Sequence, residues 1–238
     1  MKLIRLLSLL LFFNTLLNAQ NLKKVDAIIY SYIEPNSIEE LSNRIDYDFK
    51  TDLEKVRAIY NWIALNIEYD VFKTTVLNSP EFFIYQNNDD LNRIKRIQTI
   101  KQINKTFDSK KGVCVDYALL FNKICNLLNI KNELVYGYTK SSVNQIGIIP
   151  TSKNHVWNAV YINNKWIMID VTYGSGYVYK NVWQKKLNLD YFNASKEKLK
   201  LTHFPSKKIW QDHLNQKPLK EFCLAPFYKD IYFKQKLN

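Results

Sequence analysis

Apolar residues in the first half of the chain recur at helical spacing and predict a series of amphipathic helices. Residues 21–48 predict a mostly helical lead-in that is broken at Pro35. The sequence Thr51-Asp52-Leu53-Glu54 has the form of a capping box and predicts a helix that continues to Ile67. Residues 91–107 predict a further helix. Its inward face is predicted to carry Ile94, Ile97, Ile100 and Ile103.

Another helix is predicted to start at Cys114. Its buried face is a set of apolar residues at helical spacing, namely Tyr117, Leu120, Phe121, Ile124, Leu127 and Leu128. Gly112, two residues earlier, supplies the backbone freedom that a sharp entry needs. Cys114 then lies on the first turn, where unpaired N–H groups and the positive end of the helix dipole favour a thiolate over a thiol. Cys114 is therefore a candidate nucleophile.

The middle of the chain predicts antiparallel strands. Residues 134–138, 155–162 and 165–172 have strand composition, and the last two segments meet at Asn163-Asn164. Asparagine tolerates the left-handed geometry that a two-residue hairpin turn requires. The chain is thus predicted to be an α+β protein, with the Cys114 helix packed on an antiparallel sheet.

The hairpin register predicts that a histidine and an aspartate share one face of this sheet. If Asn163-Asn164 forms the turn, His155 lies opposite Thr172 and Trp157 lies opposite Asp170. Opposed and alternate residues share a face, so all four side chains point the same way. His155 and Asp170 would be diagonal neighbours, about 7–8 Å apart at the backbone.

Cysteine, histidine and aspartate have natural roles in acyl transfer. Cys114 would attack a carbonyl carbon, His155 would take its proton, and Asp170 would fix the histidine tautomer. The backbone N–H of Cys114 would face the developing oxyanion. The alternative is a purely structural set, in which a buried cysteine, a strand histidine and a surface aspartate do no chemistry.

The first residues predict export. Lys2 and Arg5 give a positive start, an apolar run follows from Leu6 to Leu17, and Ala19 offers a small residue for cleavage. Residues 1–19 are therefore predicted to be a signal peptide and 20–238 a single domain, with a helical lead-in and a wrapping C-terminal tail. The apolar run is short for a membrane span, so the mature chain is predicted to have none and to be secreted or periplasmic.

Charge and cysteine count narrow the partners. Loss of the two basic residues in the signal segment lowers the formal net charge from +12 to +10. Export and the scattering of the lysines argue against nucleic acid as a partner. An odd count of three cysteines leaves at least one free thiol; Cys125 has the spacing of a buried apolar residue, and a Cys125–Cys223 disulfide is left open. The sequence has no pair of cysteines or histidines at the spacing typical of zinc ligands, so no metal or cofactor is predicted.

Three segments around the candidate residues resemble the cysteine, histidine and aspartate motifs of the transglutaminase-like superfamily, papain-related cysteine enzymes. They are Lys111-Gly112-Val113-Cys114-Val115-Asp116-Tyr117-Ala118, His155-Val156-Trp157-Asn158-Ala159-Val160 and Trp166-Ile167-Met168-Ile169-Asp170-Val171-Thr172-Tyr173. The resemblance implies a papain-like fold, with Cys114 as nucleophile, His155 as base and Asp170 as orienting group.

Further segments are similar to the branch related to the kyphoscoliosis peptidase. They are Tyr60-Asn61-Trp62-Ile63-Ala64-Leu65-Asn66-Ile67-Glu68-Tyr69-Asp70, Tyr191-Phe192, His203-Phe204-Pro205 and Trp210-Gln211. A tryptophan upstream of the cysteine lines the site in several relatives, which makes Trp62 a candidate oxyanion or lining residue. Trp157, on the predicted face of His155, is a second lining candidate. His203 is interpreted as structural.

The sequence thus predicts an exported cysteine enzyme that performs acyl transfer on a protein or peptide, cell-wall peptide included. Hydrolysis is favoured, because crosslinking needs a second site for an amine and no sequence sign of one exists. A crosslinking transglutaminase and a non-catalytic peptide-binding or scaffold module of the same fold are the alternatives. The oligomeric state is left open.

Overall fold

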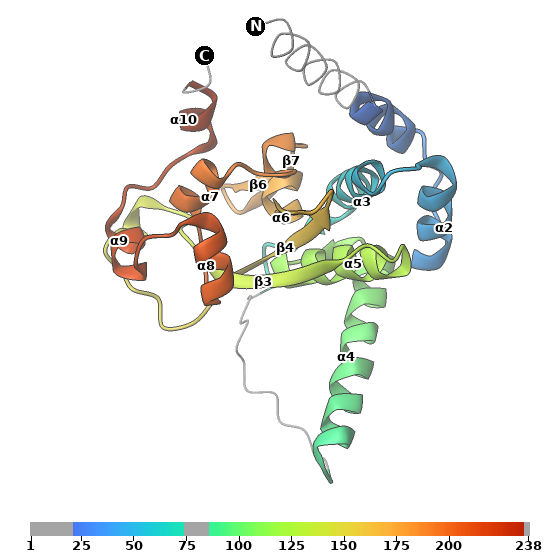
Figure 1. Ribbon diagram of the computed structural model, residues 1–238, viewed down its shortest axis with the longest axis horizontal. Helices are drawn as coiled ribbons and strands as arrows, with labels where there is room; N and C mark the ends of the chain where they lie inside the picture. Colours follow the sequence, from blue (N-terminus) through green and yellow to red (C-terminus); the bar gives the residue numbers. More distant parts are fainter. Residues whose placement is uncertain (1–20, 74–85, 236–238) are drawn as a thin grey trace, which may run out of the picture.

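The centre of the molecule is a four-stranded antiparallel sheet with the strand order β5-β4-β3-β8 (Figure 1). This computed structural model describes residues 21–73 and 86–235, so the predicted signal peptide lies outside the described residues. The strands are β3 (Asn132–Thr139), β4 (His155–Ile162), β5 (Lys165–Ile169) and β8 (His203–Pro205). Two short pairs accompany them, β1 (Glu68–Tyr69) with β2 (Lys111–Gly112), and β6 (Gly176–Tyr179) with β7 (Val182–Lys185). The α+β prediction is confirmed.

The helices before the sheet follow the sequence pattern closely. Residues 21–30 are helical, and a non-helical stretch separates them from the next helix. These helices are α2 (Ile38–Asp48), α3 (Asp52–Asn66), α4 (Asn88–Ser109) and α5 (Cys114–Leu127). At the start of α3, the Thr51 hydroxyl accepts a bond from the Glu54 N–H, and the Glu54 carboxylate accepts one from the Thr51 N–H. The predicted capping box is confirmed.

Helix α4 departs from the prediction that all its isoleucines face inward. Ile103 is buried, whereas Ile97 and Ile100 are exposed. The first half of α4 extends away from the body of the molecule, as Figure 1 shows, and only its second half packs against α5. The spacing identified the helix correctly, but periodicity cannot tell whether another layer covers the apolar side.

Each face of the sheet packs against its own set of helices. Val160, Ile162 and Ile169 contribute to a core shared with α2, α3 and α5. Trp157 and Met168 belong to a separate cluster on the other face. Leu199 and Trp210 complete that cluster from α7 (Lys196–Thr202) and α8 (Lys208–Leu214). Strand alternation therefore directs side chains from β4 into two different cores.

The predicted hairpin register is confirmed as far as Ile169. Ile162 pairs with Lys165, and Asn158 pairs with Ile169. Asn163 and Asn164 adopt φ values of 50° and 61°, the left-handed geometry expected for the turn. The strand ends there, however, because Asp170 caps α6 (Val171–Ser175). The predicted pairing of Trp157 with Asp170 and of His155 with Thr172 is therefore wrong.

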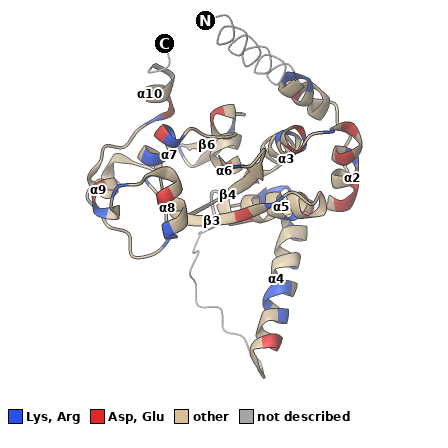
Figure 2. Ribbon diagram, viewed as in Figure 1, with Lys and Arg blue, Asp and Glu red and all other residues tan. Residues whose placement is uncertain are grey.

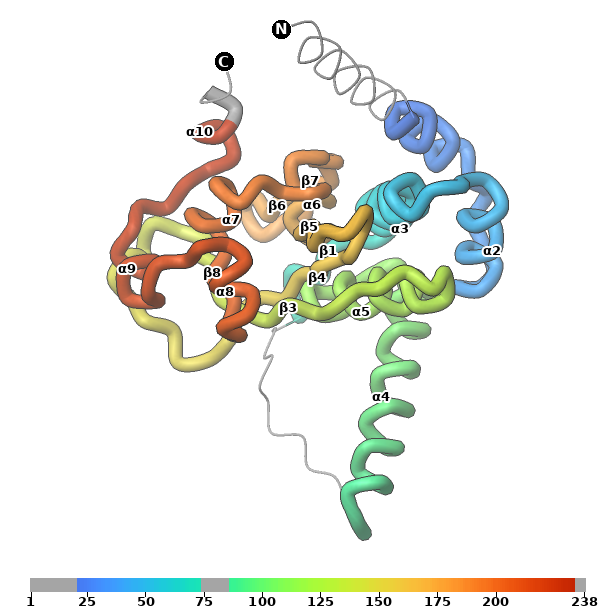
Figure 3. The backbone as a smooth tube through the Cα atoms, viewed as in Figure 1, coloured from blue at the N-terminus to red at the C-terminus, as the bar shows by residue number. Residues whose placement is uncertain are grey.

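The tail after Tyr177 returns to the sheet. Helices α7 and α8 flank β8, and α9 (Leu219–Leu224) and α10 (Asp230–Gln235) follow. Figure 3 traces α8 and α9 on the side of the molecule opposite α2. Strand β8 pairs with β3, with Thr139 facing His203 and Gly137 facing Pro205. A Cβ on Gly137 would clash with the Phe204 carbonyl, so the missing side chain permits the close approach of β8.

The scattered charges and the free cysteines agree with the expectations from the sequence. Lysines and arginines are spread over several elements, with acidic residues on α2 (Figure 2). Cys114, Cys125 and Cys223 are all free and buried, so the Cys125–Cys223 disulfide left open by the sequence is not formed. In the described parts of the chain, no helix has both the length and the apolar character needed to cross a membrane.

Candidate active site

A buried carboxylate fixes the start of the helix that carries Cys114. Asp116 accepts a bond from the Val113 N–H at 2.8 Å, in place of a side-chain N-cap. The other oxygen accepts from the Gln102 amide at 2.6 Å, and Lys73 forms an ion pair at 2.7 Å. Three segments thus converge on one side chain in the first turn, which orders the backbone at Cys114.

Gly112 is required for space and not for an unusual backbone angle. Its φ lies outside the left-handed region, which corrects the sequence-based reason given for it. A Cβ on Gly112 would lie 2.5 Å from the Cβ and 2.9 Å from a carboxylate oxygen of Asp116. Only glycine lets this carboxylate fold back over the helix start.

Substituting alanine at Gly112 is expected to destabilise the protein by about 1–3 kcal/mol, because the buried Asp116 must move. Urea unfolding measures the free energy of unfolding. Lys111→Ala, at the exposed neighbour, is the control and should stay within about 0.5 kcal/mol of wild type. Equal stability of the two variants would contradict the steric argument.

Asp170 accepts three hydrogen bonds at the junction of β5 and α6. Its Oδ2 lies 2.6 Å from Nε2 of His155 and 2.9 Å from Nε2 of His203. Its Oδ1 accepts the Tyr173 N–H at 3.0 Å, as the cap of α6. His155 and Asp170 are in contact, as the sequence predicted, although a helix cap and not a strand pair directs the carboxylate.

His155 joins the aspartate to the cysteine. Because Asp170 occupies Nε2, Nδ1 is the ring nitrogen left for Cys114, whose side chain lies close enough to raise the pKa of His155. The imidazole is buried and stacks on Tyr173 with ring centroids 4.8 Å apart, and on Trp157 at 5.9 Å. The structure therefore brings Cys114, His155 and Asp170 into one chain of contacts.

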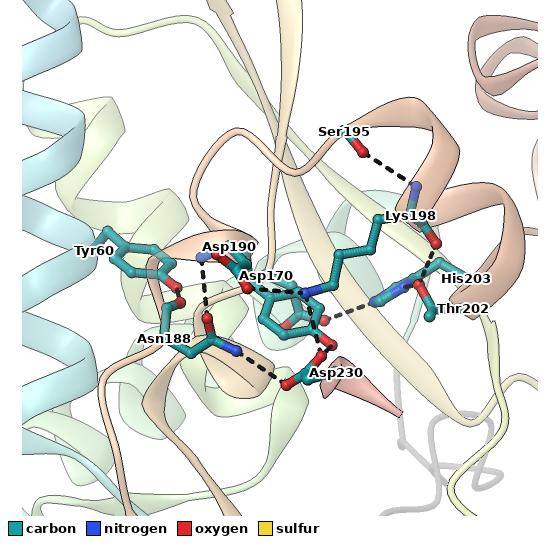
Figure 4. A network of polar contacts seen from close by, with 10 residues as sticks. Tyr60, Asp170, Asn188, Asp190, Ser195, Lys198, Thr202, His203 and Asp230 are labelled. Carbon is teal, nitrogen blue, oxygen red and sulfur yellow. Dashed lines mark hydrogen bonds and ion pairs between the residues drawn. The ribbon is translucent and has the colours of Figure 1, made fainter. Parts of the chain in front are cut away.

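His203 is the member of the cluster that the sequence argument missed. It lies on β8 and is completely buried, with Nδ1 2.7 Å from the Thr202 hydroxyl. Figure 4 shows its ring between Asp170 and Thr202. Only strand β3 separates it from His155, since Gly137 pairs with His155 on one side and Pro205 on the other. The segment His203-Phe204-Pro205 signalled a shared motif, but nothing local pointed to Asp170.

The charges of the cluster are distributed unequally. Burial would lower the pKa of His155, but the adjacent Asp170 carboxylate and Cys114 outweigh it and raise this pKa to about 10. Burial would raise the pKa of Asp170, but the two histidines hold it well below its usual range. Burial lowers the pKa of His203 against the pull of Asp170, helped by the positive charges of His155 and Lys198. The positive charge is therefore expected on His155, with His203 neutral.

A cavity of about 870 Å³ opens at the cluster. Cys114 and His155 lie in its wall, and Tyr173 and Trp183 add aromatic surface. Residues 227–230 complete the wall from the C-terminal segment. Asp230 fixes that segment by accepting bonds from Tyr191 at 2.7 Å and from Asn188 at 3.0 Å. Figure 4 shows the bond from Asn188. The cavity is large enough for a side chain and the flanking peptide units.

The two tryptophans that the sequence proposed for the site lie away from the cavity wall. Trp62, on α3, is buried in the hydrophobic core and stacks on Phe107 with ring centroids 5.4 Å apart. It is not among the described residues that line the cavity. Trp157 is also buried and does not reach the described wall. It instead packs against His155 and, edge to face, against His203 at 4.9 Å. Trp157 thus supports the histidines from behind.

The same three residues have the ligand types of a metal site. The potential ligand atoms of His155, Asp170 and His203 lie within 4.8 Å of one another. Both Nε2 atoms, however, lie at hydrogen-bond distance from one carboxylate oxygen, which requires a proton on each nitrogen where a metal would need a lone pair. The arrangement fits a proton-sharing cluster better than a metal centre.

Comparisons with known proteins agree with the motifs. A model of the Transglutaminase-like superfamily matches residues 39–171. The kyphoscoliosis peptidase of Homo sapiens is 28% identical over 222 residues, which cover 92% of this chain and 31% of that protein. The Lim and transglutaminase domain protein ltd-1 of Caenorhabditis elegans is 22% identical over 219 residues, 86% of this chain and 27% of that protein. The chain spans about a third of the length of these curated relatives.

One solved structure, from Cytophaga hutchinsonii, is 23% identical in sequence, and the match covers 66% of this chain and 44% of the Cytophaga chain. Its TM-score of 0.39 is too low to add to the comparison. The resemblance to the superfamily and to its kyphoscoliosis peptidase branch, inferred from the motifs, is confirmed by the family model and the curated relatives.

Proposed function

The chain belongs to the transglutaminase-like superfamily, and from that premise we propose that it is a cysteine acyl-transfer enzyme that hydrolyses amide or peptide bonds. The observation that carries the proposal is the buried contact chain from Cys114 through His155 to Asp170 at the wall of a cavity. An imidazole with a raised pKa beside a thiol favours a thiolate–imidazolium pair, which is the reactive form of a cysteine nucleophile.

Acylation would begin with attack of the Cys114 Sγ on the carbonyl carbon of the substrate. The backbone N–H of Cys114, in the first turn of α5, would bind the oxyanion, because first-turn N–H groups have no acceptor within their helix. His155 Nδ1–H would protonate the leaving nitrogen as the carbon–nitrogen bond breaks. The products are a thioester on Cys114 and a free amine.

Deacylation would reverse the proton path. Neutral His155 takes a proton from water, the oxygen attacks the thioester carbon, and the carbon–sulfur bond breaks to return the thiolate. The second product is a carboxylic acid. Asp170 keeps Nε2 of His155 protonated throughout, so Nδ1 alone exchanges protons.

An alternative is that an amine, in place of water, resolves the thioester and crosslinks proteins. A second alternative is a peptide-binding or scaffold module that retains the groove without catalysis.

Casein labelled with fluorescein tests hydrolysis by release of small peptides, and incorporation of dansylcadaverine into casein tests transfer to an amine. We favour hydrolysis because water alone can resolve the thioester, whereas crosslinking needs a second site that holds an amine.

We also propose that the protein acts outside the cytoplasm, secreted or in the periplasm, on proteins or peptides that include cell-wall peptides. The support is the signal-like sequence of residues 1–19 and the positive net charge. Nucleic acid is not proposed as a partner. Sequencing the N-terminus of the protein purified from whole cells tests this: a start at Gln20 is expected, and a retained Met1 would contradict processing by export.

Alkylation of Cys114 is the direct test of the proposed function. Iodoacetamide at pH 7 should label Cys114 at least about tenfold faster than a model thiol, because a free cysteine is mostly protonated there. His155→Ala should bring the rate down to that of the model thiol. Mass spectrometry locates the label. Equal rates for wild type, variant and model thiol would leave only the binding module.

A further inference from the structure

We propose that His203 is a positioning residue for the reaction: its Nε2–H holds the Asp170 carboxylate in the one orientation that serves His155. The proposal rests on the proposed function for its meaning in catalysis. His203 reaches no described cavity wall, and it does not touch Cys114 in the described contacts. It acts through Asp170 alone.

The geometry leaves His203 little other use. Both histidine Nε2 atoms converge on Oδ2 of Asp170, at 2.6 Å for His155 and 2.9 Å for His203. Tyr173 holds the other oxygen through its N–H at 3.0 Å. With a donor on each oxygen, the carboxylate cannot rotate about its Cβ–Cγ bond without breaking a buried hydrogen bond. Without His203, the only donor to Oδ2 would be His155, the group that the carboxylate has to orient. Tyr173 would then be the only other donor to the carboxylate.

The protonation of His203 follows from its neighbours. The charged groups that face it are Asp170 from β5–α6, His155 from β4 and Lys198 from α7, with the rings of Tyr173 and Tyr191 beside it. Two cations already lie near, so a third on a fully buried ring is disfavoured. A neutral His203 must keep its proton on Nε2 to bind the carboxylate.

Asp170, and not Thr202, selects that tautomer, because a carboxylate oxygen accepts and cannot donate, so the proton must be on Nε2. The Thr202 hydroxyl lies 2.7 Å from Nδ1 of His203 and donates to the Lys198 carbonyl at 2.8 Å (Figure 4). Its single proton can reach Nδ1 of the neutral ring only by turning away from that carbonyl. The edge of the Trp157 ring, 4.9 Å away between centroids, fixes the plane of the imidazole. Strand β8 and the indole together aim one N–H at one oxygen.

The test compares three substitutions at His203. His203→Gln retains an amide N–H at the position of Nε2, His203→Asn is too short to reach Oδ2, and His203→Phe fills the space without a donor. With 4-nitrophenyl acetate as acyl donor, Phe and Asn should lower kcat about 10–100-fold with KM nearly unchanged, the size typical for loss of an orienting group. Gln should restore kcat to within about threefold of wild type.

The imidazole titration of His155, followed by NMR with ¹⁵N-labelled histidine, is the second readout. The chain has three histidines, so single substitutions assign the signals. Wild type should titrate near pH 10. In His203→Phe and His203→Asn the midpoint should fall toward the ordinary value of about 6.5, because the carboxylate no longer stays against the ring. A structural role alone would lower the melting temperature and leave this midpoint unchanged.

These outcomes separate the two proposals. If wild-type Cys114 reacts like a model thiol, the proposed function fails, while the titration still decides whether His203 positions Asp170. If His203→Phe folds and keeps the wild-type midpoint for His155 and the wild-type kcat, the positioning role is overturned. If that variant does not fold, the Gln and Asn variants decide: different midpoints support the proposal, and equal midpoints overturn it.

Discussion

Replacing Cys114 with serine is expected to abolish acyl transfer, lowering the rate with 4-nitrophenyl acetate by about 10³-fold or more. A serine hydroxyl stays protonated beside His155, where the thiol can pass its proton to the imidazole. Wild type should release one nitrophenolate per chain in a burst and carry one acetyl group on Cys114 by mass spectrometry. The serine variant should show neither the burst nor the adduct.

The other two cysteines provide matched controls. Cys125 is fully buried in the core, where burial raises the pKa of its thiol, and Cys223 lies in a separate cluster. Cys125→Ala and Cys223→Ala should keep the full burst, although the first is expected to lose stability through the core cavity it creates. A burst that persists in Cys114→Ser and disappears in either control would assign the nucleophile elsewhere.

Local sequence rules predicted the elements that bear the site, because those rules act over a few residues. The Asn163-Asn164 turn set the hairpin register, which brought His155 near the end of β5. Helical spacing after Val113 placed Cys114 on a first turn. Asp170 was expected on a strand; its backbone instead leaves the sheet and the side chain caps α6. The predicted contact with His155 is nevertheless present, because either geometry directs the carboxylate to the same end of β4.

The parts that the sequence did not predict depend on contacts between distant segments. His203 reaches Asp170 because β8 adds to the far edge of β3, a pairing that no periodicity encodes. The space required around Gly112 is set by Asp116, a helix residue whose partners come from α4 and from Lys73. A glycine can answer a steric need or an angular one, and the sequence alone does not distinguish them.

One consequence of the cluster is that a single carboxylate controls the charge of two imidazoles. The Asp170 anion keeps His155 protonated and binds a neutral His203 through the same oxygen. Removing its charge while preserving its shape should therefore separate electrostatics from packing. Asp170→Asn is that change, since the amide oxygen can still accept the two Nε2–H bonds.

Asp170→Asn is expected to lower the acylation rate at pH 7.5 by about 10²–10⁴-fold, the range seen when the orienting carboxylate of a catalytic triad is replaced by an amide. With the amide oxygen toward the histidines, the N–H₂ faces the Tyr173 N–H and that bond is lost; the flipped amide would lose both histidine bonds. Asp190→Asn removes an exposed negative charge near the cluster and should remain within about twofold of wild type.

The pH profile of Asp170→Asn identifies the cause of that loss. Protonated His155 pairs with the thiolate and gives its proton to the leaving group, so activity disappears as the pH rises through the pKa of His155. That pKa is about 10 in wild type, and the alkaline limb of kcat/KM should lie there. Without the anion, burial dominates and the limb should fall to pH 6.5 or below. A limb that stays near pH 10 in a folded Asp170→Asn would show that Asp170 does not hold the charge on His155.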